Sequence, residues 1–328
     1  MKYLITGITG FAGPHLANLL IEEGHEVHGL VRGSNGMETD ILDVVPVDNF
    51  ELIKFVYGDL IDRQRMIEVV RSEQYDGIFH LAAQSHPPTS FIDPVGTFNN
   101  NVMGSINLIE AVVENSPHTK FMFCSTSEVY GNTGSDGRKL KEDDPILPSN
   151  PYGNSKAAID LYLQERFTNK KIKGFITRAF SHTGPRRGKT FSISSDAYQL
   201  ANMSKDGDLK VGNLSTTRVV MDVRDTVRAY YLLMMNENSD GQVFNVCGDT
   251  PRKMEYFTDL LIDIHGQPVN KVIHKPFWRP HDIFYQHADV SKLHNLTGWE
   301  PVISIEQTMS DLYEYWRVKH GRVTQTQS

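Results

Sequence analysis

The sequence contains little cysteine and no long hydrophobic run. Its two cysteines, Cys124 and Cys247, are too few for a disulfide framework, and both stand in or beside apolar runs, where we expect buried thiols. No run approaches the roughly 18 apolar residues that a membrane span needs. Glycines interrupt the apolar N-terminal stretch too early for a signal peptide. The sequence therefore predicts a soluble, cytoplasmic protein with no membrane partner.

An excess of positive charge is also absent. Lysine and arginine total 33, aspartate and glutamate total 40, and the net charge is -7. Because nucleic-acid binding depends on a basic surface, we expect no nucleic-acid partner, although a local basic pocket for one phosphorylated small molecule is compatible with this charge. We expect no metal site. A hydrophobic content of 39% is typical of globular proteins, and 328 residues fit one or two domains.

Short apolar segments alternate with helical patterns through the first half of the chain. The predicted strands are residues 2–6, 26–31, 50–56, 77–83, 119–125 and 172–180. The predicted helices are residues 14–24, 62–73, 93–115 and 151–167. Asp62 is the expected N-cap of the second helix. This alternation predicts an α/β fold with a parallel sheet that helices cover on both faces.

The pattern weakens after about residue 180. Polar loops, scattered helices and short strands follow, and residues 242–248 look like one more strand of the first unit. We therefore expect two domains, with the chain crossing between them. The larger would comprise residues 1–180 plus about 217–248, and the smaller C-terminal α/β substrate domain residues of about 181–216 plus 249–328.

A glycine-rich segment, "TGITGFAG" at residues 6–13, follows the first strand and precedes the first helix. Glycine lets the backbone turn tightly and approach a pyrophosphate, and the helix N-terminus supplies amides and a positive dipole end. The alternative is a glycine-rich turn with no ligand. The order strand, glycines, helix favours a dinucleotide site.

The residues after the second strand bear on the choice of dinucleotide. An acidic residue at this place would bind the ribose 2′-hydroxyl of NAD, but the chain offers Arg32 and no acid, which favours NADP. A solvated surface arginine is the alternative. Asp59, after the third strand, is placed to bind the adenine amino group or to act as a turn residue.

Tyr152 and Lys156 lie four residues apart on a predicted helix and so share a face. A tyrosine phenol has a pKa near 10, and a nearby ammonium would stabilise the phenolate and let it act as a base. The spacing alone is weak, because Tyr315 and Lys319 repeat it in the C-terminal helix. The first pair is distinguished by its place after "CSTSEVYG", residues 124–131, where a strand ends in hydroxyls and a carboxylate.

These motifs resemble those of the extended short-chain dehydrogenase/reductase family. "TGITGFAG", "HLAAQS", "STSEVYG", "PYGNSK" and "RAFSHTGP" occur in the order of that family over nearly the whole chain. Within it the chain most resembles GDP-mannose 4,6-dehydratases and the related GDP-4-keto-6-deoxy-sugar reductases. The resemblance implies a Rossmann doubly wound sheet, a smaller domain for a nucleotide-sugar, and a homodimer or homotetramer. An apolar stripe would suit the dimer interface or packing on the sheet: Val95, Phe98, Val102, Ile106, Ile109 and Val113.

The resemblance also implies catalytic roles. Thr126 would hydrogen-bond the sugar 4-hydroxyl, and Tyr152, supported by Lys156, would take its proton. Glu128 would then take the C5 proton as water leaves C6. A simple epimerase needs no carboxylate here, so Glu128 is the discriminating residue; its alternative role is to cap the following turn.

Other positions are carried over from the family in two groups. The expected cofactor-binding residues are Thr6, Gly7, Gly10, Phe11, Ala12, Gly13, Arg32, Asp59, Leu60, Leu81, Ala82, Ala83, Tyr152, Lys156 and Phe180. The expected substrate-binding residues are Gln84, Ser85, Ser127, Ser181, Arg187, Val211, Asn213, Arg218 and Arg279. Arg186, beside Arg187, is expected as a further phosphate contact.

The sequence thus predicts an NADP-dependent nucleotide-sugar 4,6-dehydratase, with GDP-mannose as the example substrate and NAD as the less favoured cofactor. Ser181 stands where the family has asparagine, and Val219 where it has aspartate. One alternative is an NADPH-dependent reductase of a GDP-4-keto-6-deoxy sugar, which would not need Glu128. A nucleotide-sugar epimerase and a non-catalytic NADP(H) sensor are the others.

Overall fold

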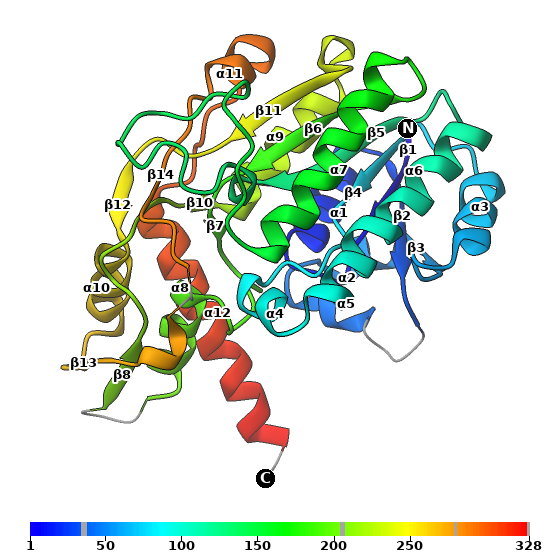
Figure 1. Ribbon diagram of the computed structural model, residues 1–328. Helices are drawn as coiled ribbons and strands as arrows, with labels where there is room; N and C mark the ends of the chain where they lie inside the picture. Colours follow the sequence, from blue (N-terminus) through cyan, green and yellow to red (C-terminus); the bar gives the residue numbers. More distant parts are fainter. Residues whose placement is uncertain (34–37, 204–206, 279–280, 327–328) are drawn as a thin grey trace.

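A seven-stranded parallel sheet forms the centre of the larger part of the molecule (Figure 1). The structure is a computed structural model that describes residues 1–33, 38–203, 207–278 and 281–326. The sheet order is β11-β6-β5-β4-β1-β2-β3. The strands are β1 (Lys2–Thr6), β2 (Glu26–Val31), β3 (Ile53–Tyr57), β4 (Gly77–His80), β5 (Lys120–Thr126), β6 (Lys173–Ala179) and β11 (Gln242–Val246). The strand order reverses between β1 and β4, which is where open α/β sheets bind ligands.

Helices cover both faces of this sheet, as the alternating pattern predicts. On one face α1 (Ala12–Glu22) packs with α9 (Val223–Met234) over a core that includes Ile5, Phe79 and Phe244. On the other face lie α3 (Arg63–Ser72), α6 (Gly104–Asn115) and α7 (Pro151–Thr168). The side chain of Asp62 accepts a hydrogen bond from Arg65 N, so the predicted N-cap of α3 is confirmed.

Two sequence-based boundaries were wrong. Residues 50–51 belong to the short helix α2 (Val47–Glu51) and not to β3, because apolar residues alone do not separate a short helix from a strand. The helix expected over residues 93–115 is three segments. α5 (Pro94–Phe98) leads through a π-helical turn (Asn99–Met103) into α6. Asn101, in this turn, bonds through its side chain to Gln84 and Ser155.

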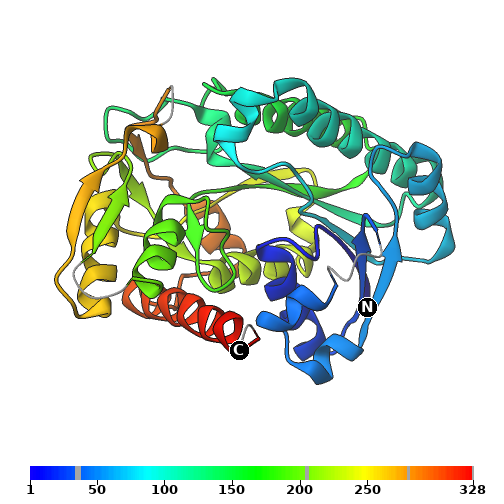
Figure 2. The same cartoon turned by 90° about the horizontal axis from the view of Figure 1, so that it is seen from below.

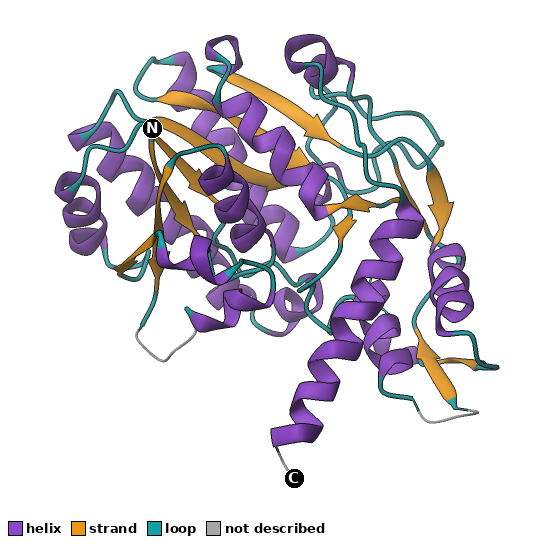
Figure 3. Ribbon diagram, turned by 180° about the vertical axis from the view of Figure 1, so that it is seen from behind, coloured by secondary structure: helices purple, strands orange, loops and turns teal. Residues whose placement is uncertain are grey.

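A second group of elements lies beside the carboxyl ends of the strands (Figures 1 and 3). Its helices are α8 (Ser192–Ala201), α10 (Met254–His265) and α12 (Ile305–Thr326), which share one apolar core. Its short strands are β8 (Asp208–Val211), β9 (Thr217–Val219), β12 (Pro251–Lys253), β13 (Asn270–Ile273) and β14 (Tyr285–Gln286). Two-residue strands β7 (His182–Thr183) and β10 (Met221–Asp222) pair at the boundary.

The remaining described elements are short: α4 (Pro87–Ile92), α11 (Ser291–Thr297), and the 3-10 turns Thr39–Asp43, Ser127–Tyr130, Glu237–Ser239 and Lys275–Phe277. Among the described residues, no helix is long and apolar enough to cross a membrane. The fold class is therefore as predicted, whereas the exact division of the chain into two domains stays a prediction.

Candidate active site

The glycine-rich turn after β1 has a backbone that only glycine fits. Gly7 has φ +74°, and a Cβ there would stand 2.8 Å from the Ala82 nitrogen. A Cβ on Gly13 would stand 2.3 Å from the Gly7 carbonyl oxygen. α1 begins at Ala12, so Gly13 is its second residue. This close-packed turn ahead of a helix N-terminus suits a pyrophosphate.

A buried chain of hydrogen bonds joins Thr6, at the end of β1, to His80 on β4 and to Ser105 on α6. Thr6 Oγ1 lies 2.7 Å from His80 Nδ1 and accepts a hydrogen bond from Ala82 N, and His80 Nε2 lies 2.8 Å from Ser105 Oγ. Burial lowers the pKa of His80 to about 3, so its imidazole is neutral and has one donor and one acceptor for its two neighbours. The Thr6 hydroxyl therefore serves the fold of the loop.

Asn101 extends this network toward α7. Its Oδ1 accepts from Gln84 N at 2.7 Å, and its Nδ2 donates to Gln84 O and to Ser155 Oγ. Ser155 Oγ in turn donates to the carbonyl oxygen of Tyr152. One buried amide thus fixes the loop after β4 relative to the first turns of α7.

The strand end "STSE" folds into a turn of Thr126, Ser127 and Glu128, which we call the catalytic turn after the role predicted for it. Thr126 Oγ1 accepts a hydrogen bond from Glu128 N at 3.3 Å and so caps the following 3-10 turn. Asn150 Oδ1 caps α7 by accepting from Gly153 N, while its Nδ2 donates to Glu128 Oε2 at 2.7 Å. The same residue therefore orients both the helix that carries Tyr152 and the carboxylate.

The phenol of Tyr152 lies at the centre of this group. Burial raises its pKa above the ordinary value of 10, and the negative charge of Glu128 raises it further. A hydrogen bond with Thr126 and the positive charge of Arg187 lower it. Glu128 and Arg187 act on the phenol through their charges, and Thr126 acts on it through a hydrogen bond. The structure therefore brings four predicted site residues together at the carboxyl end of β5.

Lys156 lies one turn further along α7 and is buried. Its ammonium stands 4.3 Å from the ring centroid of Phe123, and burial lowers its pKa. Cys124, expected to be fully buried, is only partly so; its Sγ lies 3.4 Å from Tyr230 Oη. Cys247 is buried as expected.

Arg187 and its neighbour Arg186 have different surroundings. The Arg187 guanidinium stacks on the rings of Phe191 and Phe11, at 3.5 and 4.7 Å from their centroids. Arg186 has a left-handed φ of 74° and donates to the carbonyl oxygens of Thr9 and Gly10, each at 2.9 Å. Arg186 therefore fastens the glycine-rich turn, and only Arg187 faces the catalytic group.

Two strands of the smaller part hold a second cluster. Arg218 on β9 donates to Asp282 Oδ1 at 3.5 Å, and Asn213 Nδ2 donates to Asp282 Oδ2 at 3.1 Å. Gln286 on β14 pairs with Arg218 in register and reaches the catalytic turn through Ser127. This arrangement places a cation beside the catalytic turn, where a diphosphate would fit.

Several expected site residues use their side chains elsewhere. Phe180 and Val211 are buried in core clusters, Leu60 packs beneath α6, and Asp59 Oδ1 accepts from Ile61 N, as a turn aspartate does. The Gln84 amide binds Thr97 Oγ1 and His86 N.

The remaining expected residues that the structure describes lie in the loops after β2, β4 and β6. Arg32, just after β2, and Ser85, in the loop after β4, are exposed, whereas Ser181, in the loop after β6, is half-buried. Leu81, Ala82 and Ala83 follow β4 directly, with Leu81 N donating to Thr6 O. Arg279 lies outside the described residues.

Sequence reasoning missed Asn150, Gln286 and Asp282. Asn150 had a usable signal, since asparagine directly before "PYG" is typical of an N-cap followed by proline at the first helical position. Gln286 and Asp282 had none, because their partners lie far away along the chain and only the tertiary fold joins them.

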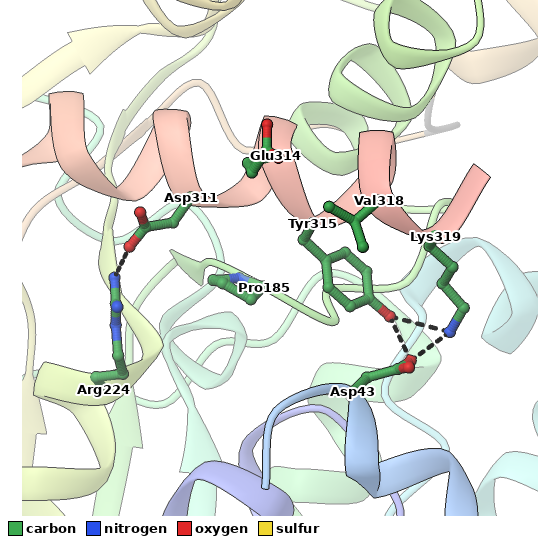
Figure 4. Close-up of a pocket in the computed structure, with 8 residues that line it drawn as sticks. All are labelled: Asp43, Pro185, Arg224, Asp311, Glu314, Tyr315, Val318 and Lys319. Carbon is green, nitrogen blue, oxygen red and sulfur yellow. Dashed lines mark hydrogen bonds and ion pairs between the residues drawn. The ribbon is translucent and has the colours of Figure 1, made fainter. Parts of the chain in front are cut away.

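A cavity of about 420 Å³ lies elsewhere, between α12 and the turn after β2 (Figure 4). Asp43 Oδ2 accepts hydrogen bonds there from Tyr315 Oη at 3.0 Å and from Lys319 Nζ at 2.5 Å. Arg224 Nη2, on α9, donates to Asp311 on α12. None of the described residues lining this cavity belongs to the catalytic group. The second Tyr–Lys pair therefore joins α12 to the larger part of the molecule.

Comparison with known proteins agrees with this geometry. Residues 4–312 match the family model described as GDP-mannose 4,6 dehydratase. The chain belongs to the GDP-mannose 4,6-dehydratase family. It is 30% identical over 322 residues to "GDP-mannose 4,6 dehydratase 1" of Arabidopsis thaliana, which covers 93% of this chain and 86% of that protein. It is also 28% identical to "GDP-6-deoxy-D-mannose reductase" of Pseudomonas aeruginosa, covering 96% of this chain and 97% of that protein.

Solved structures extend this family assignment to the fold. The structure of RMD from Pseudomonas aeruginosa complexed with NADPH matches 97% of this chain and 99% of its own, with a TM-score of 0.80 and 25% identity. A UDP-glucuronic acid 4-epimerase from Bacillus cereus, in complex with UDP-glucuronic acid and NAD, is similar in fold, with a TM-score of 0.84 at 24% identity. This family therefore acts on nucleotide-sugars with a nicotinamide cofactor.

Proposed function

We propose that this protein is an NADP-dependent nucleotide-sugar 4,6-dehydratase, a lyase that acts on a GDP-hexose such as GDP-mannose. The observation that carries the proposal is the position of Glu128. Its carboxylate is oriented by Asn150 and lies close enough to Tyr152 to raise the pKa of that phenol. A second acid–base group beside the first is what water elimination requires and simple oxidation or reduction at C4 does not.

The residues of the chain divide the proton transfers between them. Thr126 holds the sugar 4-hydroxyl, and Tyr152 takes its proton, with the Arg187 charge favouring the phenolate. The resulting 4-keto group acidifies the C5 hydrogen. Glu128 takes that proton and passes it to the C6 hydroxyl, which leaves as water while the C5–C6 double bond forms. Tyr152 and Glu128 thus act at adjacent carbons of one sugar.

A bound nicotinamide would accept hydride from C4 and return it to C6, so the cofactor would end as it began. The chain's own residues fit such a group, since Gly7 and Gly13 leave no room for a Cβ where the backbone meets the helix N-terminus. The exposed Arg32 at the end of β2 is placed to bind a ribose 2′-phosphate, which supports NADP over NAD. Arg187, Asn213, Arg218 and Arg279 are the proposed substrate contacts.

A reductase of a GDP-4-keto-6-deoxy sugar is the second candidate. The observation in its favour is the nearly full-length match to the Pseudomonas aeruginosa reductase, with 97% of that protein covered. Such an enzyme would use Tyr152 as an acid and would consume NADPH. It would not need Glu128, so substitution of this residue separates the two candidates.

Glu128→Gln removes the carboxylate but keeps the side-chain size. If the chain is a dehydratase, the variant should lose water elimination by about 100-fold or more, the range expected for removal of an acid–base group. Oxidation at C4, followed by mass spectrometry of the sugar in a single turnover, should persist. Retention of full elimination by Glu128→Gln would contradict the role of Glu128.

The association state, cellular compartment and domain boundaries belong to the same proposal. We propose a cytoplasmic homo-oligomer, built at least from dimers, with the domains divided near residues 180, 217 and 248. Apolar side chains that are exposed on α4, α5 and the π-helical turn support the dimer: Ile92 at 85%, Val95 at 78% and Met103 at 49% exposure.

A further inference from the structure

The catalytic turn is held from the smaller part of the molecule by one glutamine. Ser127 Oγ donates to Gln286 Oε1 at 3.2 Å, and Gln286 Nε2 donates back to the carbonyl oxygen of Ser127 at 3.2 Å. Both residues are nearly inaccessible to solvent, at 4% and 2% exposure. The contact joins positions 159 residues apart in the sequence.

The location of this contact distinguishes it from an ordinary packing contact. Ser127 stands between Thr126, which holds the 4-hydroxyl in the proposed reaction, and Glu128, which takes the C5 proton. The Glu128 side chain is oriented from α7 by Asn150. Gln286 fixes the backbone of the same turn from β14, so the carboxylate depends on both amides for its position.

Gln286 is also connected to the cluster proposed to bind the diphosphate. It pairs with Arg218 in the register of β14 and β9, and Arg218 in turn contacts Asp282. A diphosphate bound at Arg218 would therefore contact the β9 residue that pairs with Gln286 on β14, and Gln286 holds the catalytic turn. Substrate position and carboxylate position would be set by the same two strands.

We propose that Gln286 is a positioning residue for the water-elimination step, acting through Ser127 on Glu128. This inference rests on the proposed dehydratase function. Because a buried amide that lacks a hydrogen-bond partner loses its hydration without compensation, each of the two reciprocal bonds helps to hold the turn. A displacement of about 1 Å at a reacting group costs about 100-fold in rate, which sets the scale of the expected effect.

The test is Gln286→Met, which keeps the length of the side chain and removes both hydrogen bonds. In a single turnover of GDP-mannose with NADP+-loaded enzyme in excess, mass spectrometry follows two sugars, the 4-keto hexose that has lost two hydrogens and the product that has lost one water. We expect elimination to slow by about 10- to 100-fold, with C4 oxidation within about 3-fold of the wild type. GDP affinity by calorimetry should stay within about 2-fold.

Two further variants make the test specific. Ser127→Ala keeps the bond from Gln286 Nε2 to the carbonyl oxygen and removes the other, so it should slow elimination less than Gln286→Met does. Gln199→Met is the matched control, because Gln199 lies in the same part of the molecule and binds Ser195 Oγ and Lys210 O instead of the catalytic turn. Gln199→Met should not change the ratio of the rates of water elimination and C4 oxidation.

Equal loss of both steps, or an unchanged ratio of steps in both Gln286→Met and Ser127→Ala, would overturn the inference. Failure of the proposed function itself has a different signature. In that case the wild-type protein would form no product that has lost water, whatever residue stands at position 286.

Discussion

At the scale of single residues, the site depends on amides that each serve two purposes. Asn150 caps α7 and orients Glu128, and Asn101 fixes the loop after β4 while reaching α7. The acid–base groups were predicted from their place in motifs that resemble those of a known family. The sequence did not predict the amides that aim them, because asparagine and glutamine are common and their partners become visible only in the fold.

Asn150 allows its two purposes to be separated. Asn150→Ser and Asn150→Asp both retain an oxygen that can cap α7, so their free energies of unfolding should stay within about 1 kcal/mol of the wild type. Both lose the donor to Glu128, and Asn150→Asp places a like charge beside it. Water elimination should fall in both variants. Single-turnover mass spectrometry and a urea titration measure the two effects.

Elimination at the wild-type rate in Asn150→Asp would show that Glu128 does not need this contact. Asn49→Ser is a suitable control, since Asn49 donates to Asn18 far from the catalytic group. Its rate of elimination should match that of the wild type.

At the scale of elements, the smaller part contains a buried acid that makes its stability depend on pH. Asp196 on α8 accepts a hydrogen bond from Thr258 Oγ1 on α10 at 2.7 Å, and burial raises its pKa to about 7. A folded-state pKa above the unfolded value means that the folded state binds the proton more tightly. Stability is therefore greatest below the unfolded pKa and falls as the pH rises toward 7, where the loss levels off.

Asp196→Asn should remove this pH dependence. Near pH 4 the variant and the wild type should unfold at similar denaturant concentrations, because both side chains are then uncharged. At pH 8 the variant should be more stable by about 4 kcal/mol, since it avoids a buried charge. Urea unfolding at both values measures the difference. A constant difference across this range would contradict the assignment.

Two helical segments show that a local sequence pattern does not determine what its residues contact. The stripe expected along residues 93–115 is divided by the structure, with Ile109 buried on the sheet and Val95 and Phe98 exposed. The repeated Tyr–Lys spacing in α12 serves a contact with Asp43 (Figure 4). Figure 2 shows from below that α12 lies beside the N-terminal helices. Spacing alone did not separate the proposed catalytic pair, Tyr152 and Lys156, from a structural one.

At the scale of the whole molecule, the fold follows from its sequence more directly than the site does. Alternation of apolar and helical segments predicted the parallel sheet, and the glycine order predicted the turn after β1. The contacts between the two parts of the molecule, such as Ser127 with Gln286, had no local signal because they join segments far apart in the chain. Those contacts orient the proposed chemistry.

The exposed apolar side chains of α5 give a prediction about assembly. If they form a dimer interface, Val95→Asp should shift the protein to monomer, because a buried unpaired carboxylate at an interface is costly. Light scattering after gel filtration measures the mass. Val302→Asp, at a residue 73% exposed outside this helical region, is the control and should leave the mass unchanged. A Val95→Asp protein with the mass of the wild type would contradict this interface.

The central claim is that the chain removes water from a GDP-hexose without net use of its cofactor. Mass spectrometry of GDP-mannose after incubation with the purified enzyme and a catalytic amount of NADP+ tests it most directly. The account predicts a product lighter by one water and no net formation of NADPH. No loss of water from GDP-mannose, together with oxidation of NADPH when a GDP-4-keto-6-deoxy sugar is supplied, would contradict the dehydratase and establish the reductase.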